Sequence, residues 1–169
     1  MANDIAMSDT GRSIVKSEGW AHMKVTVRCN DTTALYPGAV VTRDGEIVPD
    51  VCLLDGHGDT PFAVLGLPAD QDIDTAFTDN DEVVAYMMGS GAVVKCLMID
   101  GMLAAAGEPL YADPTATGYV VPVHHMASLS MNAASLATIL PRMARGYVGR
   151  SLYQVATYAS VQPVWVALV

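Results

Sequence analysis

Basic residues are scarce in this sequence. It contains nine Lys and Arg against 18 Asp and Glu, which gives its 169 residues a formal net charge of −9. A protein that binds nucleic acid directly needs many Lys and Arg side chains, because these displace the counterions of the phosphates. We therefore expect no nucleic-acid partner.

Charged residues of both signs are also few, at 16% of the chain, whereas 51% of the residues are apolar. A compact monomer with this composition would expose much uncharged surface. Such surface is typical of proteins that work in an assembly. The composition therefore favours a role in protein–protein contact.

Cysteine is rare as well. Cys29, Cys52 and Cys96 are odd in number, form no CxxC pair and have no histidine nearby at the spacing of metal ligands. A chain of this length can bury a sizeable core without covalent staples. We expect buried free thiols in a reducing compartment and no disulfide scaffold.

Long apolar runs are missing too. None approaches the roughly 18 residues that span a bilayer, and the first residues, MANDIAMSDTGR, lack the basic region and apolar core of a signal peptide. We expect a protein made in the cytoplasm with no membrane segment. Residues 1–18 are polar and weakly periodic, which predicts a flexible arm, or one that orders against a partner.

Turn signals, by contrast, are abundant, and they define a unit at residues 34–68. An apolar run at 39–42 and an extended Ile47-Val48 flank a turn at Asp44-Gly45. Asp-Gly between two β-branched runs is a strong hairpin signal, because a type I′ turn needs positive φ at both central residues. The pattern predicts a β-hairpin, with residues 51–60 as a connecting loop.

The same order of signals returns at residues 103–152, which predicts two copies of one β unit. The matched landmarks are Gly38 with Gly107, Gly45 with Gly118, Val48-Pro49 with Val121-Pro122, and Gly66 with Gly149. Their spacing is uneven, so we expect the register to drift because the loops differ in length. Chance similarity of Gly and Pro spacing is the alternative explanation.

Two further segments have clear patterns. The apolar stretches 83–88 and 92–99 flank Gly89-Ser90-Gly91 and predict a second hairpin. Residues 127–140 are rich in Ala and have apolar residues at helical spacing, which predicts an inserted helix ended by Pro141.

These patterns together predict a mainly β fold made of two related modules, each a small antiparallel β-barrel unit. We expect a flexible arm at 1–18, a first module at 19–102, and a second at 103–169 that carries a helical insertion at 124–145.

An acidic stretch has part of the pattern of a calcium loop. Asp70, Asp72 and Asp74 stand at positions one, three and five, and Asp81 at the twelfth. The sixth position, however, is Thr75, where the sharp turn calls for Gly, and Asp81 is too short to act as the usual bidentate Glu. We expect a solvated loop between strands, with calcium binding as the alternative.

Histidines give two candidate sites. His57 lies in Asp55-Gly56-His57-Gly58-Asp59, but two glycines beside a polar pair are also what a tight loop requires, and no serine elbow or phosphate-cradling motif accompanies it. His124-His125 would point to opposite faces of a strand and could not easily share one metal ion. We expect a loop and a surface pair at the entrance of the helix, and no enzyme.

The order of the pieces resembles a known family. It runs from a polar arm to ALYPGAVVTRDGEIVPD, PFAVLGLPADQDIDTAFTDNDE and EVVAYMMGSGAVVKCLM. This resembles the head decoration (capsid cement) proteins of tailed bacteriophages, typified by the decoration protein of phage lambda. The resemblance covers residues 35–102, and 103–169 through the second copy. The chain is longer than the simplest members, and Phe62-Ala63-Val64-Leu65-Gly66 replaces their commoner Val-Gly-Val type of strand.

The resemblance implies a β-tulip-like fold that sits on the outside of an icosahedral capsid, often as a homotrimer, and clamps neighbouring subunits of the major capsid protein. It implies a virion protein with no cofactor and no catalytic residue. On this interpretation the arm contacts the capsid and the helical insertion lies at a subunit contact. The candidate contact residues are Met1, Ile5, Met7 and Ile14 in the arm, and Met126, Met131, Leu136 and Met143 in the insertion.

Two alternatives stay open. One is a different structural protein of the virion, such as a fibre base or a minor shell subunit. The other is a small-ligand-binding or enzymatic β-barrel protein.

Overall fold

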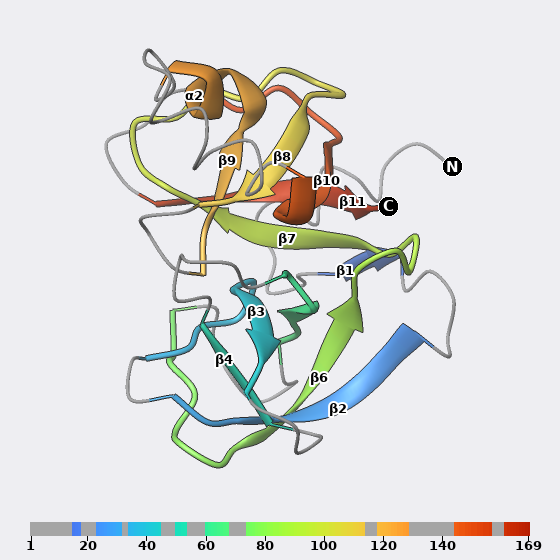
Figure 1. The fold of residues 1–169 in the computed structure, drawn as a ribbon, viewed down its shortest axis with the longest axis vertical. Coiled ribbons are helices and arrows are strands. Elements are labelled where there is room, and N and C mark those ends of the chain that lie inside the picture. The colour runs from blue at the N-terminus through green and yellow to red at the C-terminus, as the bar shows by residue number, and fades with distance from the viewer. Residues whose placement is uncertain are drawn as a thin grey trace.

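The computed structural model describes residues 15–17, 23–31, 34–44, 50–53, 60–67, 74–113, 118–128, 144–156 and 161–169. It shows a mainly β protein with one short helix in this part of the chain, so the predicted fold class is confirmed. Two groups of strands lie one above the other, and the helix covers the far end of the upper group (Figure 1).

The lower group is a closed five-stranded barrel in the order β2-β4-β3-β5-β6. Its strands are β2 (Lys24–Cys29), β3 (Val40–Arg43), β4 (Asp50–Leu53), β5 (Ala63–Leu65) and β6 (Glu82–Met87). The pair β2–β4 is parallel and the other pairs are antiparallel.

Side chains alternate across this barrel, as the pleat of a strand requires. In β6, Val83 and Ala85 face the barrel interior and pack with Val27, whereas Val84 between them is 38% exposed. In β5 and β6, Val64 and Tyr86 point away from that interior and belong to a second buried cluster. The barrel is therefore apolar on part of its outer face as well as inside.

The upper group repeats the topology of the barrel. Its strands are β7 (Val93–Met98), β8 (Pro109–Ala112), β9 (Val120–Pro122), β10 (Tyr147–Ser151) and β11 (Gln162–Leu168). They follow one another as β7-β11-β10-β8-β9, and a parallel pairing of β9 with β7 joins the two ends. Each pairing has a counterpart of the same direction in the barrel, so the prediction of two related β units is confirmed.

The hydrogen-bond register fixes the alignment of the two units. Cys29 opposes Val51 as Met98 opposes Val120, and Thr42 opposes Cys52 as Tyr111 opposes Val121. Each described residue of 24–53 therefore has its counterpart 69 positions later in 93–122. Cys29 corresponds to Met98, and Val51 corresponds to Val120. The expected drift of register in this part of the repeat is wrong.

Two of the matched landmarks lie in described residues. Gly38 and Gly107 are counterparts, since each has positive φ; the Gly38 N–H donates to Leu65 O and the Gly107 N–H donates to Ser151 O. The counterpart of Gly66 is Leu152, because the Gly66 N–H donates to Val84 O and the Leu152 N–H donates to Trp165 O. The match of Gly66 with Gly149 is therefore displaced by three residues, and Gly45 and Val48-Pro49 lie outside the described residues.

The second predicted hairpin is wrong. β6 pairs with β2 and β5, whereas β7 pairs with β1, β9 and β11, so the turn at Gly89-Ser90-Gly91 carries the chain from one unit to the other. Each strand has an extended antiparallel partner inside its own unit, which leaves no edge for a β6–β7 ladder. β7, which the sequence assigned to the first module, pairs in the second.

The first predicted hairpin exists with a longer connection. β3 pairs with β4, which begins at Asp50, so residues 51–53 form a strand where a loop was expected. Val51 lies in β4 opposite Cys29 of β2, and this pairing closes the barrel. Ile47-Val48 lies outside the described residues.

The helix and the arm differ from the prediction at their described ends. α2 (Val123–Ser128) begins directly after β9, four residues before the expected start, and most of the predicted helix at 127–140 lies outside the described residues. From the predicted arm, β1 (Val15–Ser17) pairs with the start of β7, with Val15 opposite Val94. Residues 1–14 lie outside the described part of the chain.

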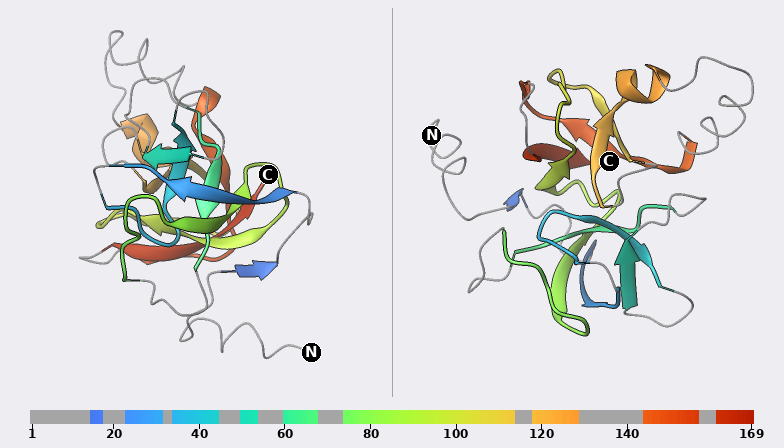
Figure 2. Two further views of the ribbon diagram at one scale, coloured as in Figure 1. Left: turned by 90° about the horizontal axis from the view of Figure 1, so that it is seen from below. Right: turned by 90° about the vertical axis from the view of Figure 1, so that its left-hand side faces the viewer.

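The two units share a core. One cluster of buried side chains combines Val40, Val64 and Tyr86 of the barrel with Cys96 and Val166 of the upper sheet. Two backbone hydrogen bonds also cross the boundary, from Leu97 N to Gly38 O at 3.1 Å and from Val40 N to Gly118 O at 3.0 Å. The right-hand view of Figure 2 again shows the two groups of strands stacked one above the other.

Candidate functional site

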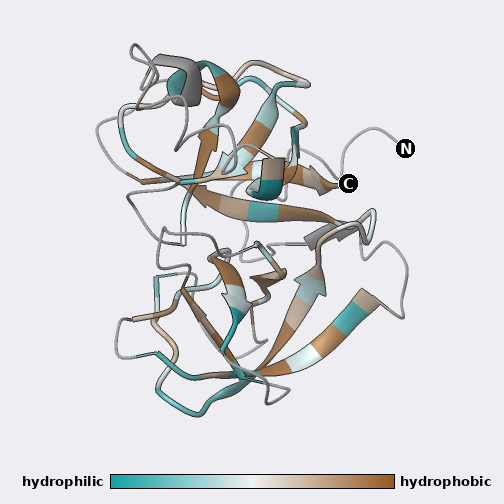
Figure 3. Ribbon diagram, in the orientation of Figure 1, coloured by the Kyte–Doolittle hydropathy of each residue, from teal (hydrophilic) through white to brown (hydrophobic). Residues whose placement is uncertain are grey.

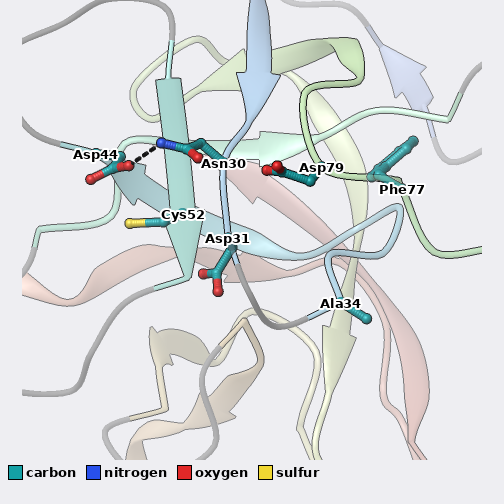
Figure 4. Close-up of a pocket in the computed structure, with 7 residues that line it drawn as sticks. All are labelled: Asn30, Asp31, Ala34, Asp44, Cys52, Phe77 and Asp79. Carbon is teal, nitrogen blue, oxygen red and sulfur yellow. Dashed lines mark hydrogen bonds between the residues drawn. The ribbon is translucent and has the colours of Figure 1, made fainter.

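A polar hollow of about 710 Å³ opens at one end of the barrel. Figure 4 shows its lining, which consists of Asn30, Asp31, Ala34, Asp44, Cys52, Phe77 and Asp79. These residues come from the ends of β2 and β3, from β4, and from the segment before β6. The same end of the molecule is hydrophilic in Figure 3, where teal ribbon follows the loops below the barrel.

The carboxylates of this hollow are engaged in holding the loops. Asp31 Oδ2 accepts the backbone N–H of Leu53 at 2.7 Å, and the Asn30 amide donates to Asp44 Oδ2 (Figure 4). Asp79 Oδ2 accepts from the Asn80 side chain at 2.8 Å. The hollow has an acidic character that suits a cationic group, but its acids already stabilise the turns around it.

The second unit does not reproduce this hollow. The counterparts of Asn30 and Cys52 are Ile99 and Val121, and Val121 packs with Ile99 and Tyr111. An apolar cluster therefore replaces Asn30 and Cys52, whereas the counterparts of Asp31 and Asp44 are again acids, Asp100 and Asp113.

The acidic stretch with part of the calcium-loop pattern forms a tight turn in its described part. Asp81 Oδ2 accepts the Thr78 N–H at 2.7 Å, and Asn80 has a φ of 72°, a left-handed conformation that Asn tolerates. The side chain of Phe77 is 6% exposed in the barrel core. Asp70 and Asp72 lie outside the described residues. Within the described ranges no group of three His, Cys, Asp or Glu side chains is placed to hold a metal ion.

An ion pair closes the barrel where β2 meets β4. Arg28 donates from Nε and Nη2 to the two carboxylate oxygens of Asp50 at 2.6 and 2.7 Å. This hydrogen bonding lowers the pKa of Asp50 against the opposing effect of burial, and it raises the pKa of Arg28. The pair locks the short parallel ladder in which Arg28 lies opposite Asp50.

A second pair lies beside the turn that precedes β8. His124 Nδ1 is 2.6 Å from Glu108 Oε1, and Glu108 Oε2 accepts the Ala105 N–H at 2.8 Å. Burial acts to raise the pKa of Glu108, but the hydrogen bonds from Ala105 and His124 outweigh it and lower the pKa overall. The imidazole side chain is 55% exposed, so this pair is a surface feature.

That pair borders an open hollow of about 540 Å³ whose walls are mostly small or apolar. Its lining residues are Leu103, Ala105, Ala106, Gly107, Glu108 and His124. Leu103 is 43% exposed, and Ala105 to Gly107 are also exposed. The arrangement offers contact surface rather than an enclosed binding cavity.

Comparison with models of known protein families finds no match. No curated protein matches the sequence either. No helix in the described part of the chain is long and apolar enough to cross a membrane.

Most of the candidate contact residues cannot be placed. Met1, Ile5, Met7 and Ile14, like Met131, Leu136 and Met143, lie outside the described residues, and so does His57. Met126 lies in α2, but its side chain is not described. His124 and His125 lie in the first turn of that helix, as expected of a pair at its entrance.

The cysteines are free thiols, as predicted. Cys29 and Cys96 are buried and Cys52 is half-buried. Burial is the main cause that raises the pKa of Cys29 to about 12 and raises that of Cys96. Both therefore remain protonated and behave as small apolar side chains.

Sequence reasoning missed the two ion pairs. Arg28 and Asp50 come from strands that meet only when the barrel closes, so no local pattern links them. The turn around Gly107 was predicted through its match with Gly38, but its exposure was not, because exposure depends on how the two units pack.

Proposed function

We propose that this protein decorates and stabilises an icosahedral capsid from the outside, by binding across neighbouring subunits of the major capsid protein without catalysing a reaction. The observation that supports this most is the fold of residues 35–102. The segment that resembles the decoration proteins forms most of a small closed β-barrel, the class of fold that the resemblance implies.

The exposed apolar side chains give independent support. Among the described residues, six large apolar side chains are 36–65% exposed: Tyr36, Val84, Leu103, Tyr153, Val161 and Val169. They belong to a chain in which only 16% of residues are charged. Surface of this kind gains free energy when a protein partner covers it, at roughly 25 cal/mol per Å² of apolar area.

The described hollows also favour contact over chemistry. Their carboxylates bond backbone N–H groups, asparagine side chains or an exposed histidine, and in these contacts they stabilise turns. A general acid or base instead needs an oxygen that is free to exchange a proton with the substrate. Within the described residues, the side chains support a scaffold that presents surface.

The direct test is binding to purified shells that lack this protein. Cosedimentation with increasing amounts of protein should saturate at hundreds of copies per shell, and the decorated shells should resist heating better than bare ones. Leu103→Asp is a suitable comparison variant because its side chain is exposed and the fold should tolerate the change. No binding at any protein concentration would contradict the proposal.

Copy number separates the proposal from its alternatives. Mass spectrometry of purified particles should find hundreds of copies for a decoration protein and only a few for a fibre base or minor shell subunit. Absence from particles would favour a ligand-binding or enzymatic role in the cell.

A further inference from the structure

A small apolar hollow, which we call the β2 hollow, lies beside the short ladder between β2 and β4. Its volume is about 140 Å³. A dry apolar cavity of roughly 150 Å³ can hold a benzene-sized group, so the β2 hollow has room for one apolar side chain. Its lining consists of Val25, Thr26, Val27, Arg43, Asp50, Phe62 and Met87.

The floor of the β2 hollow belongs to the barrel interior. Val27 is buried in the barrel core, and Val25 and Phe62 pack against that core. Met87 is paired with Ala63, another core residue. An apolar group bound in the hollow would therefore extend the core of the barrel.

In the second unit the place equivalent to the β2 hollow is filled. Three side chains from the outer face of the barrel, Val40, Val64 and Tyr86, join the buried cluster there. The β2 hollow is smaller, because the barrel is closed, and one side chain fills it. The same cluster contains the counterparts of three lining residues, namely Val94 for Val25, Cys96 for Val27 and Leu168 for Met87.

The edge of β2 beside the hollow is open. Residues 24–27 pair with β6 on one side, and no other described strand pairs with them on the other. Asn30, directly after β2, donates its N–H to Val51 O of β4 at 2.9 Å, on the side away from β6. Backbone direction alternates along a strand, so Thr26 turns its N–H and C=O to this open side.

β7 shows how the equivalent edge is used in the second unit. β1 pairs antiparallel with β7, with Val15 opposite Val94, and Leu97 N donates to Gly38 O at 3.1 Å. The residue of β2 that corresponds to Val94 is Val25. In the second unit, backbone from other segments thus occupies the strand edge while apolar side chains enter the core beside it.

Cations border the β2 hollow. Arg43 lines it and is exposed, and Lys24 lies on the open edge. Of the acids on these strands, Asp50 already accepts two hydrogen bonds from Arg28, and Glu82 lies at the far end of the ladder from Lys24. This side of an otherwise acidic chain therefore suits a partner that carries a carboxylate.

We propose that an extended segment of the major capsid protein adds as a strand to the open edge of β2 and places one bulky apolar side chain in the β2 hollow. An acidic residue beside that side chain meets Arg43. The inference rests on the proposed function for the identity of the partner. The exposed turn of a second copy is a poor occupant, because Ala105, Ala106 and Gly107 offer no bulky apolar side chain.

Filling the hollow tests the inference on the full chain. Val25→Phe places a larger side chain in the β2 hollow, so it should weaken binding to purified bare shells about tenfold or more. Val84→Phe is the matched control, because Val84 is 38% exposed on the outer face of β6, and it should bind normally. Cosedimentation measures the affinity, and circular dichroism checks that both variants are folded.

A backbone variant tests the added strand. Thr26→Pro removes the N–H that faces the open edge, and an edge strand tolerates proline at such a position. Loss of one hydrogen bond should weaken shell binding about fivefold. Thr26→Val keeps the N–H and should bind like the unmodified protein.

Photo-cross-linking identifies the occupant. A benzophenone amino acid at position 26 should cross-link, on decorated shells, to one short segment of the major capsid protein in which a bulky apolar residue adjoins Asp or Glu. The same amino acid at position 161, which is exposed on the other unit, should not label that segment. A cross-link from position 26 to another copy of this chain would overturn the inference.

Benzene tests the hollow without shells. It should raise the Tm of the unmodified protein but not that of Val25→Phe, and an unchanged Tm for the unmodified protein would contradict an apolar receptor site. Normal shell binding by both Val25→Phe and Thr26→Pro would overturn the inference while the proposed function stands. Failure of the unmodified protein to bind shells would overturn both.

Discussion

Asp50 accepts both hydrogen bonds of Arg28 at the point where the barrel closes, and its folded-state pKa lies below the ordinary value of 3.8. A lowered carboxyl pKa stabilises the fold at pH values above 3.8, and this contribution is lost as the pH falls through the lower, folded-state value. We predict that Asp50→Asn lowers the Tm at pH 6 and makes the Tm less sensitive to pH between 5 and 2. Thermal unfolding followed by circular dichroism measures both effects. Asp74→Asn, at an exposed position, is the control for general acid titration, and identical pH profiles for Asp50→Asn and the unmodified protein would refute the prediction.

Val64 and Arg150 occupy equivalent positions of the two units, since Val64 pairs with Val40 as Arg150 pairs with Pro109. Val64 is fully buried between the units, whereas Arg150 is exposed. We predict that Val64→Arg destabilises the fold by about 3–5 kcal/mol, because it buries an unpaired charge. The reciprocal change Arg150→Val should cost about 1 kcal/mol at most, since it removes one exposed hydrogen bond. Urea unfolding measures both, and equal costs would show that the outer side of β5 is not a buried contact.

At the scale of elements, β1 is held by a short ladder on β7, with Val15 opposite Val94 and Ser17 opposite Val93. We predict that deleting residues 1–17 leaves the fold intact but raises hydrogen exchange at the Val93 and Val94 amides by about tenfold, because the start of β7 becomes an edge. Exchange in β3, which does not pair with β1, serves as the internal control. Unchanged exchange in β7 would mean that β1 adds no protection.

Sequence patterns captured local structure well and distant pairing poorly. The match of Gly38 with Gly107 contributed to the predicted duplication, and it holds because positive φ at these positions depends on the residue itself. The match of Gly66 with Gly149 is displaced, because the connection between the strands differs in length in the two units. The prediction of a hairpin between β6 and β7 was wrong, because a Gly-containing turn can also connect two separate units. Arg28–Asp50 and the exposed turn at 105–108 depend on the closed barrel and on the packing of one unit against the other.

At the scale of the whole molecule, the shared core implies that neither unit is stable alone. Separating them would expose Val40, Val64 and Tyr86, which are at most 6% exposed in the intact chain, and each such side chain contributes roughly 1.5–3 kcal/mol by its burial. We predict a single cooperative unfolding transition for the full chain, with fluorescence and circular dichroism midpoints that coincide. A fragment of residues 92–169 should show no cooperative transition, because it also loses two backbone hydrogen bonds to the barrel. These are the bonds from Leu97 N to Gly38 O and from Val40 N to Gly118 O. Two separate transitions in the full chain, or a cooperative transition in the fragment, would show that the units fold independently and that the contact between them adds little stability.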